Sequence, residues 1–216
     1  MSSYLLRYAA ALAGLAWLSR RTDSMYISIK QAEELGEILQ SADSDVSTEV
    51  FDSATSEKRL ERTVELMQKL IWDGARHPDV RFAAAGLVQE CPSKDRKCEI
   101  TQLFNFVKAK LRFLSDVFQV ETLHKPERLM EMIRAGRGAG DCDDHVILLC
   151  SLLLSIGIPA QIVLASTSEL KGFHHVYAAA EVTPRKWMYL DPSLKAERYK
   201  AGVEHEGIVK RKHITL

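Results

Sequence analysis

Apolar and polar residues alternate with helical spacing through the first half of the chain. Apolar side chains there recur three or four positions apart, as they do on a helix with one buried face. We expect helices over residues 31–39, 55–74, 79–89 and 100–113. Thr55 or Ser56 is placed to cap the second of these helices. The Asp/Ser-rich stretch Ser41–Ser47 is predicted to be a linker.

The pattern changes after Arg134. An uninterrupted apolar run, Val146–Ile156, predicts one helix buried on nearly all sides, and Gly157 and Pro159 end it. Three stretches rich in β-branched and aromatic residues follow and are expected to be strands: 160–165, 174–182 and 186–190. A turn at 183–185 joins the last two. One central helix followed by an antiparallel sheet is an α+β fold.

The N-terminal segment Tyr4–Leu18 is apolar apart from Arg7. As a helix it extends about 22 Å at ~1.5 Å per residue, less than the roughly 30 Å hydrocarbon core of a bilayer. The pattern favours an amphipathic helix that docks on the body of the protein or on a larger assembly. A membrane-surface helix and a signal peptide remain as alternatives, although the arginine pair Arg20-Arg21 follows the apolar stretch instead of preceding it.

The composition argues against nucleic-acid binding and against a fold held together by disulfides. The 216 residues are 46% hydrophobic, and 29 Lys+Arg balance 29 Asp+Glu, so the net charge is zero. A protein that binds nucleic acid by neutralising phosphates carries a basic surplus, so we expect no nucleic-acid partner. Four cysteines are too few for a disulfide scaffold.

Cys142 is the candidate nucleophile. It follows a glycine-rich stretch, residues 136–140, and the helix-capping residue Asp141, so it lies in the first turn of the buried helix. The unpaired amides there favour a thiolate and can stabilise an oxyanion on an attacked carbonyl. Asp141 and Asp143 oppose the thiolate, so a cationic partner is needed. Cys150, inside the apolar run, is interpreted as a small core residue.

His175 and Asp191 are the candidate partners of this thiol. His175 opens a predicted strand and can serve as base and then acid, and Asp191 ends the next strand, where it can orient the imidazole. His174 is an alternative base, because adjacent strand residues point to opposite faces and only one of the two can reach the sulfur. Asp191 taken alone can also be a turn residue before Pro192.

Cys91 and Cys98 are separated by six residues that include Pro92. Reduced thiols are the default interpretation, and a local disulfide is the alternative in an oxidising compartment. Zinc needs two further ligands, and no histidine is near in sequence.

Four separated motifs, in order, resemble the core of the transglutaminase-like superfamily. They are Gly140-Asp141-Cys142-Asp143-Asp144, Gly157-Ile158-Pro159-Ala160, His175-Val176-Tyr177 and Trp187-Met188-Tyr189-Leu190-Asp191-Pro192. The resemblance implies a papain-like arrangement in which Cys142 is the nucleophile, His175 the base and acid, and Asp191 its orienter. The resemblance covers roughly residues 96–195. We therefore predict a division into an N-terminal helix (1–21), a helical region (22–95), a catalytic core (96–200) and a C-terminal tail (201–216).

Two subgroups are closest in motif. Bacterial transglutaminase-like cysteine proteinases share the acidic run, and some hold calcium there, which implies Ca²⁺ at Asp141 and Asp143; no other cofactor is expected. Compact transglutaminase-like proteins of tailed phages carry a similar Cys91–Cys98 stretch. That resemblance implies a virion component docked through residues 4–18, whereas the alternative is a soluble cytoplasmic protein.

Two functional hypotheses follow. The first is a thiol enzyme that acts on amide bonds of a protein or peptide substrate through an acyl-enzyme, as a hydrolase or an acyl transferase. The second is a phage structural protein that keeps the fold with little or no turnover.

Overall fold

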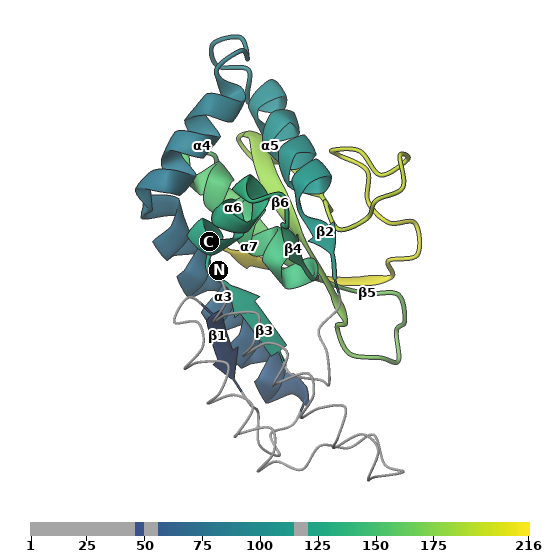
Figure 1. The fold of residues 1–216 in the computed structure, drawn as a ribbon. Helices are drawn as coiled ribbons and strands as arrows, with labels where there is room; N and C mark the ends of the chain where they lie inside the picture. The colour runs from purple at the N-terminus through teal and green to yellow at the C-terminus, as the bar shows by residue number, and fades with distance from the viewer. Residues whose placement is uncertain (1–45, 50–55, 115–120) are drawn as a thin grey trace, which may run out of the picture.

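The structure is a computed structural model that describes residues 46–49, 56–114 and 121–216. The predicted N-terminal helix (4–18), the predicted helix 31–39 and the linker up to residue 45 lie outside the described residues. Within them, helices lie on one side of a four-stranded sheet, with one helix enclosed between the two (Figure 1). This is the predicted α+β arrangement.

The helical first half forms as the apolar spacing predicts. The three helices are α3 (Ser56–Arg76), α4 (Pro78–Val88) and α5 (Arg96–Lys110). In α3 the apolar residues Val64, Met67 and Ile71, three or four positions apart, are buried, and Met67 and Ile71 are at most 1% exposed. Gly74 allows α3 to approach α6 (Pro126–Arg134) and the central helix, because a Cβ there would lie 2.3 Å from Pro126 Cγ and 2.9 Å from Ser151 Oγ.

The central helix, α7 (Cys142–Ser155), is the one predicted to be buried on nearly all sides. Every residue from Asp144 to Leu153 is buried. It packs against α3, α4, α5 and α6 on one side and against the sheet on the other (Figure 1). The side chain of Asp141 accepts hydrogen bonds from the amides of Asp143 and Asp144, and Gly157 ends the helix with a φ of +79°.

The sheet contains the three predicted strands and one further strand. Its order is β7-β6-β5-β8, all antiparallel, with β5 (Ala160–Ser166), β6 (His175–Thr183), β7 (Lys186–Leu190) and β8 (Lys210–Thr215). Alternate residues such as Val176 and Ala178 join the core around α7, whereas Tyr177 and Ala179 lie in a smaller cluster on the other face. The edge strand β8 comes from residues 201–216, for which the sequence predicted only a tail.

Two short strand pairs differ from the prediction. The parallel pair β2 (Arg112–Phe113) and β4 (Ala139–Gly140) replaces the last turn of the helix expected to reach Phe113, because the amides of Arg112 and Leu114 donate to Gly138 and Gly140. The antiparallel pair β1 (Val46–Glu49) and β3 (Glu121–His124) takes up residues 46 and 47 of the predicted linker.

Cys91 and Cys98 form a disulfide across the α4–α5 connection. The default interpretation of reduced thiols is therefore wrong, and the alternative is correct. The bond closes a short loop, which in the chain-entropy view is worth about 2.5 kcal/mol.

Within the described parts of the chain, no helix combines the length and the apolar composition needed to cross a membrane.

Candidate active site

Cys142 occupies the first position of α7, beside the short strand β4. Asp141 caps the helix, because its side chain accepts hydrogen bonds from the amides of Asp143 and Asp144 at 3.0 and 3.2 Å. The amide of His145 donates to the Asp141 carbonyl. Within the described residues the amide of Cys142 has no hydrogen-bond acceptor. Of the first four helix amides, this one is therefore left to bind a developing oxyanion.

The Cys142 thiol is half-buried, and its pKa is raised well above the ordinary value. Burial is the main cause, and the negative charges of Asp143 and Asp141 add to it. A hydrogen bond from the Val176 amide lowers the pKa but does not compensate. With its pKa raised in this way, the sulfur needs a base to remove its proton.

His175 and Asp191 lie together at adjacent strand ends. His175 begins β6, Asp191 directly follows β7, and His175 Nε2 is 2.6 Å from Asp191 Oδ2. A neutral imidazole carries one proton, and its contact with the carboxylate fixes that proton on Nε2. Nδ1 is then an acceptor that can receive a proton.

The structure brings His175, and not His174, to Asp191. The ring of His174 instead lies against the β5–β6 connection, with contacts of 3.4 Å to Ser166 Oγ and 3.2 Å to Thr167 Oγ1. His174 precedes the first residue of β6, so its ring lies with the β5–β6 connection and not at the strand end that meets Asp191.

Cys142 approaches the same strand end through the main chain. The amide that donates to its sulfur belongs to Val176, the residue after His175. Within the described contacts no direct hydrogen bond joins the sulfur to the imidazole. The structure thus places the predicted nucleophile at the start of β6 and pairs the predicted base with the predicted orienter.

Ser193 is a site residue that the sequence analysis missed. Its hydroxyl and its amide donate to Asp191 Oδ1 at 2.6 and 3.2 Å, so both carboxylate oxygens of Asp191 are bonded. Asp191 is only 4% exposed. The sequence Asp-Pro-Ser is typical of an Asp side chain that bonds the backbone two residues on, and that signal could have identified Ser193.

Comparison with protein families identifies the fold. The model of the transglutaminase-like superfamily matches residues 85–192, half of the chain, and includes Cys142, His175 and Asp191. The chain belongs to the transglutaminase-like superfamily. It is therefore a member of a family of thiol enzymes. Among curated proteins no significant match is found.

Several solved structures are similar to this transglutaminase-like chain at low identity. A putative protease from Parabacteroides distasonis has a TM-score of 0.46 at 14% identity, over 59% of this chain and 25% of its own. A putative cysteine protease from Cytophaga hutchinsonii has a TM-score of 0.39 at 14% identity, over 62% and 41%. EGTA-treated LapG from Legionella pneumophila has a TM-score of 0.37 at 17% identity, over 79% and 74%. The chain thus covers about a quarter of the first of these proteins and about two fifths of the second.

The resemblance predicts calcium at Asp141 and Asp143. Ca²⁺ takes six to eight oxygen ligands. One oxygen of Asp141 already caps α7, and Asp143 Oδ1 lies 3.8 Å from the Cys142 sulfur. Within the described residues no group of three or more His, Cys, Asp or Glu side chains is arranged to hold a metal ion. These residues do not by themselves form a calcium shell, and the calcium prediction remains untested.

A second histidine–aspartate pair, also missed by the sequence analysis, lies near the N-terminal end of α7. His124 of β3 bonds Asp144 with both its amide and its Nδ1, each at 2.9 Å. Asp144 is 1% exposed. The pair connects β3 to the first turn of α7.

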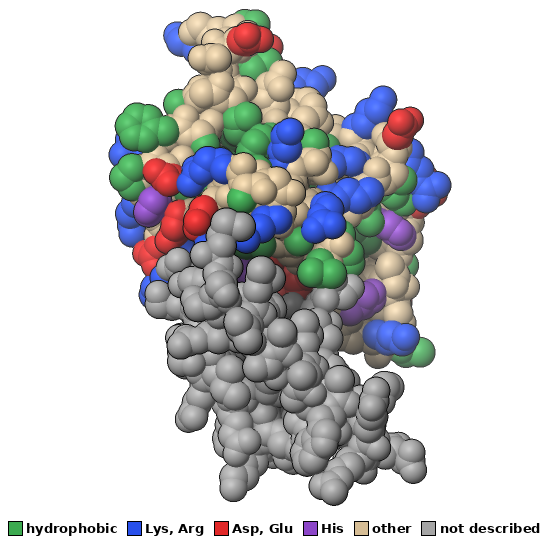
Figure 2. Space-filling model, viewed as in Figure 1, with side chains coloured by type: hydrophobic (Ala, Val, Ile, Leu, Met, Phe, Trp, Pro, Cys, Tyr) green, Lys and Arg blue, Asp and Glu red, His purple; other side chains and the backbone are tan. Residues whose placement is uncertain are grey.

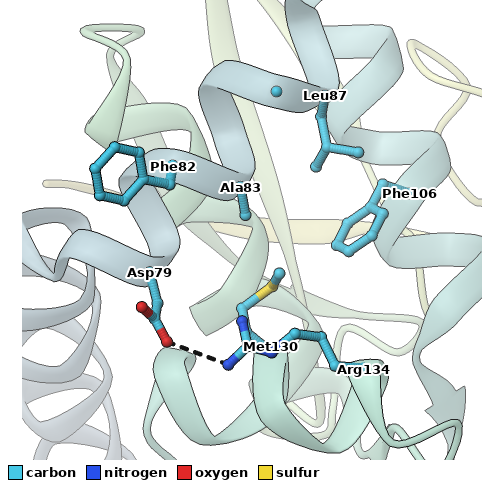
Figure 3. Close-up of a pocket in the computed structure, with 8 residues that line it drawn as sticks. Asp79, Phe82, Ala83, Leu87, Phe106, Met130 and Arg134 are labelled. Atoms are coloured by element: carbon cyan, nitrogen blue, oxygen red, sulfur yellow. Dashed lines mark hydrogen bonds and ion pairs between the residues drawn. The ribbon is translucent and has the colours of Figure 1, made fainter.

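An open groove of about 470 Å³ lies between α4, α5 and α6, and no predicted triad residue lines it. Its apolar lining includes Ala83, Leu87, Phe106 and Met130, and at its edge Arg134 donates to Asp79 across 3.1 Å (Figure 3).

The surface seen in Figure 2 carries a band of lysine and arginine side chains across its middle, so the zero net charge of the chain does not describe this face.

Proposed function

We propose that this chain is a cysteine peptidase that cleaves amide bonds of a protein or peptide substrate through an acyl-enzyme. Cys142 is the nucleophile, His175 the base and acid, and Asp191 the orienter. The observation that carries the proposal is the 2.6 Å contact between His175 Nε2 and Asp191 Oδ2 at the strand end whose amide bonds the Cys142 sulfur.

The first half-reaction forms the thioester. The Cys142 thiol passes its proton to Nδ1 of His175 as the sulfur bonds the carbonyl carbon. The amide of Cys142 stabilises the negative oxygen of the tetrahedral intermediate. The proton then moves from Nδ1 to the leaving nitrogen while the C–N bond breaks, which releases the amine and leaves the acyl group on sulfur.

The second half-reaction restores the enzyme. Water gives a proton to Nδ1 as its oxygen bonds the thioester carbon. The C–S bond breaks, the proton returns to the sulfur and a carboxylic acid leaves. An amine in place of water gives acyl transfer by the same route, so the acceptor decides between hydrolysis and transamidation.

The raised pKa of Cys142 implies that the mechanism needs general-base catalysis. A thiol that rests protonated reacts only when a base takes its proton during the attack. Asp191 supports that base, because it holds the imidazole with its proton on Nε2 and stabilises the imidazolium that forms.

The test measures cleavage of denatured casein and traps the acyl-enzyme by mass spectrometry after acid quench. We expect Cys142→Ala to abolish both signals, and Cys150→Ala, in the buried core and without a role in the reaction, to retain them. Added dansylcadaverine reports transamidation if it is incorporated. Cleavage that survives in Cys142→Ala, or a complete lack of turnover by the wild-type chain, would overturn the proposal and favour a structural role.

A further inference from the structure

Two lysines hold the segment after Asp191 against the end of α5. The ammonium of Lys108, in the last turn of α5, donates to the carbonyls of Leu194, Ala196 and Tyr199 at 2.6, 3.1 and 2.5 Å. All three protons of that ammonium therefore have acceptors on the segment.

Lys195 makes the reciprocal set of bonds. Its ammonium donates to the carbonyls of Lys108 and Leu111 at 2.6 and 2.7 Å, and to that of Pro192 at 3.1 Å. The first two are carbonyls at the C-terminal end of α5, where a positive charge is favourable. We call Lys108 and Lys195 the lysine clasp. Each lysine binds the main chain of the other's segment, so the two segments are joined in both directions.

The clasp also reaches the helix that carries the nucleophile. His145, one turn after Cys142, is fully buried, with Nδ1 at 2.6 Å from the Asp141 carbonyl. Its Nε2 is 3.0 Å from the Leu111 carbonyl, which Lys195 also bonds, and 3.4 Å from Lys195 Nζ. Burial lowers the pKa of His145, and the positive charge of Lys195 acts in the same direction. The first turn of α7, the end of α5 and the segment after Asp191 thus meet at one ammonium.

Charge gives a second connection to Asp191. Burial lowers the pKa of both Lys108 and Lys195, and this is the largest effect on each. The Asp191 carboxylate acts in the opposite direction and raises both pKa values. Coulomb attraction is mutual, so both ammonium groups also attract the carboxylate. Lysine is suited to this place because its three donors diverge around one point, whereas the planar arginine fork does not reproduce that geometry.

We propose that Lys108 and Lys195 are positioning residues that set Asp191, and through it His175, at the correct distance from Cys142. They touch neither substrate nor the reacting atoms. The proposal rests on the function proposed above, because it concerns the efficiency with which His175 activates the Cys142 thiol.

The test uses iodoacetamide as the probe and follows alkylation of Cys142 by mass spectrometry from pH 6 to 9.5. We expect Lys195→Met to slow alkylation at pH 7 roughly tenfold. The difference from wild type should narrow above pH 8, because the pKa of Lys195 is lowered to about 8 and the wild-type chain then loses this ammonium charge as well. Lys108→Met is expected to act in the same direction. Lys195→Arg keeps the charge without the threefold geometry and is expected to recover only part of the loss. Lys186→Met, on the exposed start of β7, is the matched control and leaves the rate unchanged.

A merely structural role gives the opposite sign. Loosened packing exposes thiols, so Cys142 and the buried Cys150 would then both react faster at every pH. That result, or a wild-type rate at pH 7 in folded Lys195→Met and Lys108→Met, would overturn the proposal. Asp191→Asn separates the two levels of inference. If it slows alkylation while both lysine variants do not, only the clasp proposal fails. If neither Asp191→Asn nor His175→Ala slows alkylation, the proposed function fails as well.

Discussion

Two histidine–aspartate pairs lie near the N-terminal end of α7, and they use different atoms of the imidazole. His175 bonds Asp191 through Nε2, which leaves Nδ1 as a proton acceptor. His124 bonds Asp144 through Nδ1 and also through its own amide, so one residue holds both carboxylate oxygens. The two histidine side chains are almost equally exposed, at 23% and 21%. Exposure therefore does not distinguish a candidate catalytic pair from a structural one, whereas the bonding atoms do.

The surroundings of the two carboxylates differ as well. Asp191 is supported by Ser193 and lies in the field of two lysines. Asp144 lies against Gly140, where a Cβ would come within 2.4 Å of Asp144 Oδ2. One pair is held so that the imidazole can exchange a proton, and the other fixes a strand and a glycine beside the nucleophile.

The largest expected effect is on activity. Asp191→Asn offers the imidazole an amide N–H, which favours the tautomer with its proton on Nδ1 and prevents that nitrogen from taking the thiol proton. We expect kcat/KM for casein-derived peptides to fall by about 10³-fold. Asp144→Asn is the matched variant in the second pair and is expected to lose less than about tenfold per folded molecule. Equal losses would remove the functional difference between the pairs.

Stability is expected to show the reverse order. Asp144→Ala leaves His124 without its buried partner, and we expect the free energy of unfolding to fall by about 3 kcal/mol. Asp191→Asn keeps the shape of its side chain, and we expect a loss of about 1 kcal/mol. Urea unfolding at constant m measures both changes. A larger loss for Asp191→Asn would show that we have assigned the structural role to the wrong pair.

Gly140→Ala tests the packing of the second pair. The new methyl would overlap Asp144 Oδ2 and Cβ at 2.4 and 2.6 Å, so we expect about 2 kcal/mol of destabilisation in urea melts. Gly86→Ala in α4 is the control, because no heavy atom lies within 4 Å of a Cβ there. It is expected to stabilise the protein by about 0.5 kcal/mol through helix propensity alone. Similar effects at both glycines would contradict the close packing of Gly140.

Lys195, one of the lysines beside Asp191, is expected to make the stability of the protein depend on pH. Burial lowers the pKa of Lys195 from 10.5 to about 8, with Lys108 adding to the effect. Between these values the unfolded chain binds more protons than the folded chain, so this residue makes the free energy of unfolding rise with pH from 8 toward 10. Lys195→Met is expected to remove that rise in urea melts at successive pH values. An unchanged slope would mean that the ammonium is not buried in the clasp.

Chelation is expected to have the smallest effect. Of the described carboxylates near Cys142, Asp141 caps α7 and Asp144 bonds His124, so we expect 5 mM EGTA to move the melting temperature by less than about 1 °C. The same comparison in Asp143→Ala is the control. A clear fall with EGTA in the wild type, absent from Asp143→Ala, would establish the calcium site that the resemblance implies.

The regular elements and the motifs were predictable because their signals are local. The cap at Asp141, the stop at Gly157 and the alternation in β5 to β7 all arise from residues within a few positions of one another. The sequence analysis missed helix α6, although Pro126 at its start and the spacing of Leu129, Met130 and Ile133 are ordinary helix signals. The strands β2 and β4 were not, because two residues are too few to show a period. Strand β8 resembles a charged tail, as edge strands rich in lysine do.

By itself the sequence determined that a cysteine opens a buried helix and that a histidine and an aspartate follow on strands. Capping, helix termination and strand alternation depend on near neighbours in the chain. Only the tertiary structure decided that His175, and not His174, meets Asp191, that Lys108 and Lys195 join segments more than 80 residues apart, and that His124 holds Asp144. These contacts form between distant segments, and their geometry is set by how α5, α7 and the sheet pack, so no local pattern of residue types contains them.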